Sequence, residues 1–223
     1  MCLRAADSLA AGPLAGSGAG LRARGAEDVD DAVLRAIARW PDVPAAYGWL
    51  ALDRRGDWHV KGDRITNPAV IDFIGRNHAC DEDGRWFFQN GPQRVFLTLA
   101  YTPFVLRTDP HGAPTLWTHT RAPATALTGA WLDEDGALLV GCNGSVGLVH
   151  DRDLDALLAR LCDPAGRPLP DEQVEAWLDG AAVSVRLQLE GGALAVDRIA
   201  SAQVAGRFRF DPAPAPHPGE PEC

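Results

Sequence analysis

The chain has 223 residues, a net charge of −9 and 46% hydrophobic residues, a composition typical of a folded protein with a sizeable core. The acidic balance argues against nucleic-acid binding, which usually requires a basic face. No stretch approaches the roughly 20 apolar residues that span a bilayer, so we expect no membrane association. The five cysteines include no C-x-x-C pair, which predicts reduced thiols and a cytoplasmic location.

The N-terminal part is expected to be a leader followed by a helix. Residues 1–26 are rich in Ala and Gly and predict a flexible segment. From Glu27 to Trp40 apolar residues recur at helical spacing, acids crowd the first turn and Pro41 follows. These features predict one helix ahead of a β-rich region.

The next elements alternate between hairpins and a short helix. Asp53 to Gly56 predicts a tight turn, because Asp accepts local backbone N–H bonds and Gly adopts a positive φ. Asn67 and Pro68 predict a helix start that runs to about Asn77. Two further hairpins are predicted, which pair residues 85–89 with 93–100 and residues 104–107 with 115–120.

The same layout then recurs. Asp53, Gly56 and Val60 match Asp133, Gly136 and Val140 at an offset of 80, and the C-D-x-x-G-R turn at Cys80 recurs at Cys162. A third set of landmarks, Val95, Leu97 and Leu99, matches Val183, Val185 and Leu187 at an offset of 88. The period is too long for a solenoid repeat, so we infer two copies of one supersecondary unit.

The second copy has its own helices and a tail. Asp151 predicts a helix start, and an additional helix is expected at Asp171 to Leu178. Alternating aliphatic residues from Val183 to Leu189 predict a strand, which turns back at Glu190 to Gly192. Val204, Phe208 and Phe210 suggest a last strand, and the Pro/Ala-rich residues 211–223 suggest a disordered tail.

The predicted fold class is α+β. It is a mainly antiparallel sheet built from two tandem copies of a hairpin–helix–hairpin unit, with a helical N-terminal segment. The expected divisions are a leader (1–26), a first repeat with the N-terminal helix (27–125), a second repeat (126–210) and the tail (211–223). Whether the repeats form one sheet or two lobes stays open at this point.

The two copies also separate scaffold from candidate site. Residues that both copies share are needed by the fold, whereas residues found in one copy are candidates for binding. Polar and aromatic residues of the first copy lack counterparts; in this comparison Trp58 matches Leu138 and Trp86 matches Pro168. The candidate ligand-binding residues are therefore Trp58, His59, Arg64, His78, Trp86 and Arg94. Core packing of the Trp side chains and surface positions for the Arg side chains are the alternative interpretations.

Three patterns allow a nucleophile or a metal. His78 and Cys80 would share one face of a strand, as in a Cys–His nucleophile. Ser145 follows a strand in a pattern close to a nucleophile elbow, although its first glycine is replaced. Asp81 and Asp133 begin acidic turns, but the spaced ligands of a calcium loop are missing. His78 and Cys80 could be two zinc ligands, but the sequence supplies no second pair to complete the site. Neither a metal nor a cofactor is therefore expected.

The first copy resembles a group of uncharacterised proteobacterial proteins, a domain of unknown function with G-x-W and D-x-x-G-x-aromatic motifs. The matching positions are Gly56, Trp58, Gly62, Ile65, Phe73, Asp81, Gly84, Trp86, Pro92, Val95 and the Pro103 to Val105 run. The resemblance covers residues 44–107 and implies an α+β fold of repeated motifs and a role in ligand binding or signalling. It implies no catalytic residue.

Together these patterns favour a cytoplasmic, non-enzymatic ligand-binding or regulatory module. Its ligand would sit against the first copy or between the copies, and its partner would be a small molecule or another protein. The alternatives are a small hydrolase that uses Cys80 and His78 or Ser145, and an interaction protein whose exposed strands pair with a partner.

Overall fold

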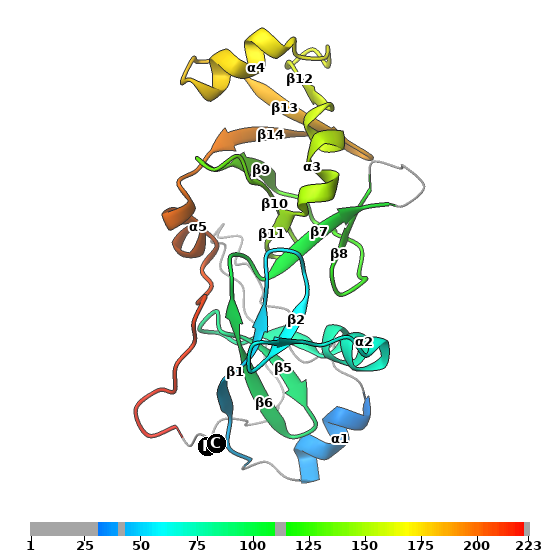
Figure 1. Ribbon diagram of the computed structural model, residues 1–223, viewed down its shortest axis with the longest axis vertical. Helices are drawn as coiled ribbons and strands as arrows, with labels where there is room; N and C mark the ends of the chain where they lie inside the picture. The colour runs from blue at the N-terminus through cyan, green and yellow to red at the C-terminus, as the bar shows by residue number, and fades with distance from the viewer. Residues whose placement is uncertain (1–30, 40–42, 110–114, 221–223) are drawn as a thin grey trace, which may run out of the picture.

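The computed structural model describes residues 31–39, 43–109 and 115–220, which form two β-sheets arranged along the long axis of the molecule (Figure 1). The leader (1–26), Cys2 and Cys223 lie outside the described residues. In chain order the elements are α1 (Asp31–Arg39), β1 (Ala46–Leu52), β2 (Trp58–Val60), β3 (Asp63–Arg64), α2 (Pro68–Arg76), β4 (His78–Cys80), β5 (Trp86–Asn90), β6 (Gln93–Leu99), β7 (Phe104–Thr108), β8 (Leu116–Thr118), β9 (Gly129–Leu132), β10 (Leu138–Cys142), β11 (Ser145–Val149), α3 (Asp151–Leu158), β12 (Leu161–Cys162), α4 (Asp171–Leu178), β13 (Val185–Leu189), β14 (Gly192–Arg198) and α5 (Ser201–Phe208).

The two sheets have the same strand order. The first sheet runs β3-β2-β1-β6-β5-β4, and the second contains β11-β10-β9-β14-β13-β12, with the β7–β8 hairpin added beside β11. The central pair of each six-strand set, β1 with β6 and β9 with β14, is parallel, while the other pairs within the sets are antiparallel. In chain order, a helix follows the third strand of each set: α2 follows β3, and α3 follows β11. The fold is therefore α+β and largely antiparallel, as predicted.

The D-x-x-G turns at Asp53 and at Asp133 have the same pair of hydrogen bonds from the backbone to the Asp side chain. Asp53 Oδ1 accepts hydrogen bonds from the backbone N–H groups of Arg55 and Asp57 at 2.8 and 2.9 Å, and Gly56 has a φ of +81°. The turn at Asp133 has the same two bonds, and Gly136 has a φ of +78°. The carboxylates of these turns thus bind their own backbone, as expected for hairpin chemistry.

The predicted offset of the last strands is wrong. Val185 lies in β13, whose counterpart is β5 and not β6: Cys80 faces Trp86, and Cys162 faces Arg186. The difference in residue number between equivalent positions rises from 82, for Cys80 and Cys162, to 100, for Trp86 and Arg186, because α4 is inserted between β12 and β13. Trp86 therefore corresponds to Arg186 and not to Pro168.

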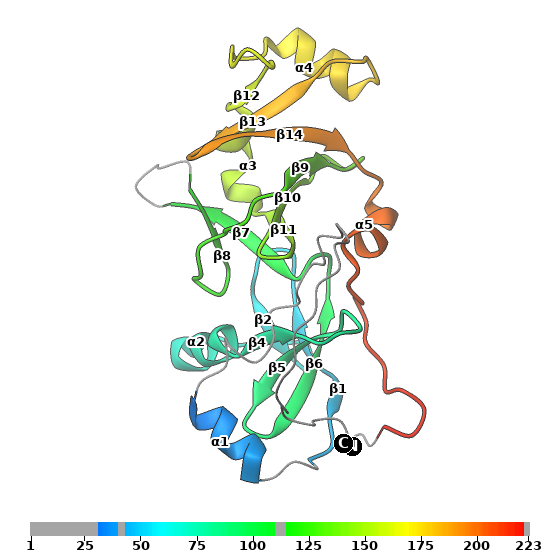
Figure 2. The same cartoon turned by 180° about the vertical axis from the view of Figure 1, so that it is seen from behind.

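The C-terminal region also differs from the expectation. Val204 and Phe208 belong to helix α5 and not to a strand, as their i, i+4 spacing allows. Residues 209–220, which we call the C-terminal strap, run along the first sheet and are held there (Figures 1 and 2). Asp211 donates its N–H to the carbonyl of Gly84 at 2.9 Å, and Leu99 donates to the carbonyl of Pro212 at 2.8 Å. Of the segment predicted to be disordered, the described residues 211–220 are therefore attached to the first sheet by hydrogen bonds.

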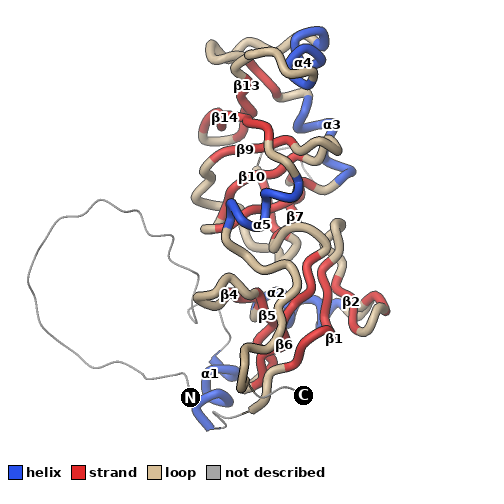
Figure 3. Tube along the Cα trace, turned by 90° about the vertical axis from the view of Figure 1, so that its left-hand side faces the viewer, coloured by secondary structure: helices blue, strands red, loops and turns tan. Residues whose placement is uncertain are grey.

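One hydrophobic core joins the two sheets. Its buried members include Leu52 and Leu97 of the first sheet and Leu106, Leu139 and Leu187 of the second. A small second cluster, which contains Phe87 and Phe96, lies on the opposite face of the first sheet. The trace in Figure 3 shows the sheets one above the other, with α5 beside their junction. Among the described residues no helix has the length and apolar character needed to span a membrane.

Candidate functional site

Aromatic and imidazole rings from both sheets meet where the sheets join. Trp58 of β2, His78 of β4 and Trp86 of β5 contact Phe104 of β7 and His119, which directly follows β8. The ring centroids of His78 and Trp86 are 4.7 Å apart, and those of Trp58 and His119 are 5.0 Å apart. We call these five residues the aromatic junction. Three of the six predicted site residues are therefore brought together.

Strand alternation explains why these side chains converge. His78 faces Phe88 and Cys80 faces Trp86 across the β4–β5 pair, so these four side chains share one face of the first sheet. That face packs on the second sheet, and Ala79 and Phe87 point to the other face. Successive strand residues point to opposite faces, so the placement follows from the register alone.

The two histidines of the junction are neutral and incompletely hydrogen-bonded. Burial lowers the pKa of His78 well below its ordinary value, and burial lowers that of His119 to about 3. His119 Nδ1 accepts a bond from the N–H of Val105 at 3.2 Å, so the proton of the neutral ring sits on Nε2. This Nε2 atom, Trp58 Nε1 and both ring nitrogens of His78 are buried without a hydrogen-bond partner among the described residues.

A pocket of about 560 Å³ opens beside the aromatic junction. It lies between the β1–β2 turn of the first sheet and the β7–β8 hairpin of the second, and His119 belongs both to its wall and to the junction. We call it the junction pocket. It is lined by Arg55, Gly56, Arg107, Thr108, Asp109, Trp117, Thr118, His119 and Arg121. Its volume is in the range of small-molecule sites.

Each arginine of the junction pocket is held by an aspartate outside the lining. Arg55 Nη2 contacts Asp151 at 2.8 Å, and Arg107 Nε contacts Asp153 at 2.6 Å; both acids lie in the first turn of α3. Arg121 Nη1 contacts Asp72 of α2 at 2.9 Å. The pairs of Arg55 and Arg121 are largely solvent-exposed, so each contributes little stability and leaves further N–H donors.

An exposed tryptophan completes the wall. Trp117 of β8 faces Arg107 of β7 directly across the hairpin, so the two side chains lie on the same face. The Trp117 side chain is 38% exposed, unlike the buried Trp58 and Trp86. An exposed indole beside a guanidinium provides a flat surface and a positive charge next to each other.

The other three predicted site residues lie elsewhere. His59 Nε2 contacts Asp53 Oδ2 at 3.0 Å, and Arg64 contacts Asp57 at 2.8 Å, so both brace the β1–β2 turn. Arg94 lies over the ring of Phe87, 4.7 Å from its centroid, on the opposite face of the first sheet. None of the three joins the aromatic junction or the junction pocket.

The nucleophile candidates are not activated. Burial raises the pKa of the Cys80 thiol to about 12, and its Sγ donates to the backbone carbonyl of Asp81 at 3.4 Å. No hydrogen bond joins Cys80 to His78 among the described residues. Ser145 lies within strand β11, opposite Cys142, and not at a strand-to-helix turn. This geometry does not support the alternative hydrolase.

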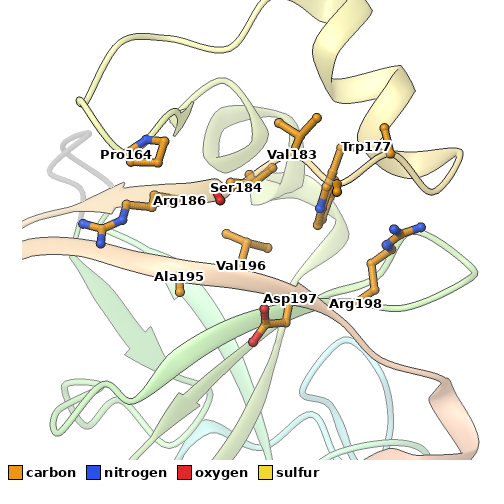
Figure 4. A pocket seen from close by; sticks show the side chains of 12 residues that line it. Pro164, Trp177, Val183, Ser184, Arg186, Ala195, Val196, Asp197 and Arg198 are labelled. Atoms are coloured by element: carbon orange, nitrogen blue, oxygen red, sulfur yellow. The ribbon is translucent and has the colours of Figure 1, made fainter.

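A second pocket of about 440 Å³ lies between α4 and the β13–β14 hairpin (Figure 4). Arg198 Nη1 donates to the carbonyl of Leu178 at 3.4 Å, a long contact at the C-terminal end of α4. Trp177 is buried there and contributes to the core. These contacts hold the inserted helix on the sheet, which is a structural role.

The junction-pocket residues Arg107, Trp117, His119 and Arg121 were not predicted. They belong to the β7–β8 hairpin and its flank, which have no counterpart in the six strands that the two sheets share. The predicted first repeat (27–125) includes this hairpin, but β7 and β8 join the second sheet beside β11. Their lack of a matching hairpin in the second repeat is the signal that could have indicated these residues.

Comparisons with known proteins give a family and distant structures. The family model DUF2944, described as "Protein of unknown function (DUF2946)", matches residues 29–215. A DUF1285 family protein from Silicibacter pomeroyi DSS-3 is 15% identical, with a TM-score of 0.47 over 71% of this chain and 85% of that one. A DUF1285 family protein from Shewanella baltica OS155 is 18% identical, with a TM-score of 0.36 over 50% and 88%. No curated protein matches the chain.

Proposed function

The chain belongs to the DUF2944 family of proteins of unknown function, and we propose that it is a non-enzymatic, regulatory ligand-binding module. Its ligand is a small anionic molecule that occupies the junction pocket. The observation that carries the proposal is the convergence of three arginines from separate segments, Arg55, Arg107 and Arg121, on one pocket with an exposed tryptophan.

The charges of the pocket support an anion. Among the described lining residues Asp109 is the one acid, and His119 is neutral, so the lining carries more positive than negative groups. Each of the three arginines is paired with an aspartate just outside the lining, so an anion would bind by replacing these carboxylates and not by meeting an unpaired charge. A carboxylate or phosphate can take the place of the aspartate partners in their exposed pairs.

The position of the pocket supports a regulatory role. Its arginines connect the β1–β2 turn and the β7–β8 hairpin to helices α2 and α3, which occupy equivalent places in the two strand sets. A ligand that binds these arginines would therefore change contacts that involve both sheets. Cys80 and Cys162 are not joined in a disulfide, which supports the proposed cytoplasmic location.

Thermal unfolding with a panel of metabolites tests the proposal. We expect at least one anionic compound to raise the Tm of the wild-type chain, and Arg107→Gln to abolish the shift. Arg64→Gln is the matched control, because Arg64 is paired with an aspartate but lies outside the pocket. No shift with any compound, or a shift that Arg107→Gln leaves intact, would count against the junction pocket as the site.

A further inference from the structure

The junction pocket places two kinds of binding group side by side. Arg107 and Trp117 are direct cross-strand partners, and Arg55 and Arg121 approach from the β1–β2 turn and from the segment after β8. A flat indole surface next to several guanidinium groups matches a ligand that combines a planar ring with a multiply charged anion. A simple carboxylic acid would use only half of this arrangement.

The guanidinium groups retain donors for such an anion. Arg107 uses its Nε for Asp153, and Arg55 and Arg121 each bind their aspartate through one terminal nitrogen. Each guanidinium has five N–H donors, so donors that these pairs with described residues do not use can meet oxygens that enter the pocket. Donors from three chain segments suit a group with several oxygens spread in space, such as phosphate, better than a planar carboxylate, which one guanidinium can satisfy.

The aromatic wall suits a heterocyclic base. Trp117 is 38% exposed and lines the pocket, so part of its surface is available to a ligand. Bases stack on such rings largely irrespective of sequence, because each base has a π-face.

Resting on the proposed function, we infer that the ligand class is a mononucleotide. Its base stacks on Trp117, and its phosphate lies among Arg107, Arg55 and Arg121. A pocket of about 560 Å³ is large enough for one such molecule. The inference concerns a free nucleotide and not a nucleic-acid strand, which the net charge of −9 disfavours.

Calorimetric titration of the full chain tests the inference with AMP, adenosine and inorganic phosphate. We expect AMP to bind more tightly than either fragment. Trp117→Ala should weaken AMP binding about tenfold, as expected for loss of one stacked base, and Trp117→Phe should restore much of it. Arg107→Gln should weaken binding at least as much, and Arg64→Gln should have no effect. Circular dichroism and the Tm of each variant check that it is folded.

The outcomes separate the two proposals. If AMP does not bind while another anion raises the Tm through Arg107, the nucleotide class is wrong and the ligand-binding role stands. If neither AMP nor any panel compound binds, both fail. AMP binding that is unchanged in Trp117→Ala and Arg107→Gln would place the nucleotide outside the junction pocket and would also overturn the inference.

Discussion

The β1–β2 turn packs directly on His119: a Cβ atom at Gly56 would lie 2.8 Å from the Cβ of His119. This contact brings the turn that carries Arg55 against the hairpin that carries Arg107 and Trp117. At the equivalent turn of the second sheet, no atom of a described residue beyond the chain neighbours of Gly136 lies within 4 Å of the same position. The two glycines thus share a conformation but differ in their surroundings.

The first prediction uses this pair. Gly56→Ala and Gly136→Ala both place a side chain at a φ near +80°, which costs about 1–2 kcal/mol. Gly56→Ala should lose a further ~1–3 kcal/mol, because the methyl group collides with His119 and with Val105. Urea unfolding of both variants measures the difference. Equal losses would show that the turn does not press on the hairpin.

A second pair of glycines tests the C-terminal strap. Gly84 and Gly166 have φ values of +81° and +80°, but a Cβ at Gly84 would collide with the backbone carbonyl of Arg209, whereas nothing lies near Gly166. Gly84→Ala should therefore release the strap, and Gly166→Ala should leave it bound. Hydrogen exchange of the Asp211 amide, which donates to the Gly84 carbonyl, reports the release. Unchanged protection in Gly84→Ala would mean that the strap is held elsewhere.

Acid should weaken the aromatic junction. The pKa values of His78 and His119 are lowered by burial, so the unfolded chain binds protons more readily below about pH 6.5. Their contribution to stability is complete above that pH and is lost as the pH falls below it, by up to about 1.4 kcal/mol per pH unit for each ring. For His119 this loss continues to about pH 3. His59, whose pKa is raised chiefly by its hydrogen bond to Asp53, opposes the trend.

Urea unfolding at pH 7.5, 6.0 and 5.0 measures this dependence. His78→Phe keeps an aromatic ring beside Trp86 and removes a group that has no hydrogen-bond partner among the described residues, so its loss of stability between pH 7.5 and 5.0 should be smaller than that of the wild type. An equal loss of stability between pH 7.5 and 5.0 in both proteins would refute the assignment of the acid sensitivity to His78.

Cys80 should be unreactive in the folded protein. Burial raises the pKa of its thiol to about 12, so little of the reactive thiolate form is present at neutral pH. Iodoacetamide at pH 7.5, followed by peptide mapping, should label Cys80 only in urea, as for the buried Cys162 at the equivalent position. Rapid labelling of native Cys80 but not of Cys162 would revive the Cys80 nucleophile.

The sequence predicts the local structure well and the long-range contacts poorly. The D-x-x-G turns and the cap of Asn67, whose side chain accepts from the N–H of Ala69 at 3.0 Å, are set by neighbouring residues and were predicted correctly. The bond from Arg85 to Glu220 joins residues 135 positions apart, and no local pattern announces it. The C-terminal strap was missed for that reason.

The candidate site was half predicted for a related reason. Trp58, His78 and Trp86 were predicted because the second predicted copy lacks them, whereas His119 and Trp117 come from the β7–β8 hairpin, which has no counterpart in the strand order that the two sheets share. The error in the last strand match arose because α4 is inserted in one copy only. The two strand sets share one order, as a tandem copy of one segment would predict, and the β7–β8 hairpin lies outside this shared order.

Hydrogen–deuterium exchange with the panel compound that raises the Tm most is the most direct test of the junction pocket. Protection should appear in the segments at 54–57, 105–109 and 117–121, which contain the lining residues, and should be lost in Arg107→Gln. Protection confined to residues 177–186 and 195–198, beside the pocket under α4, would contradict the account.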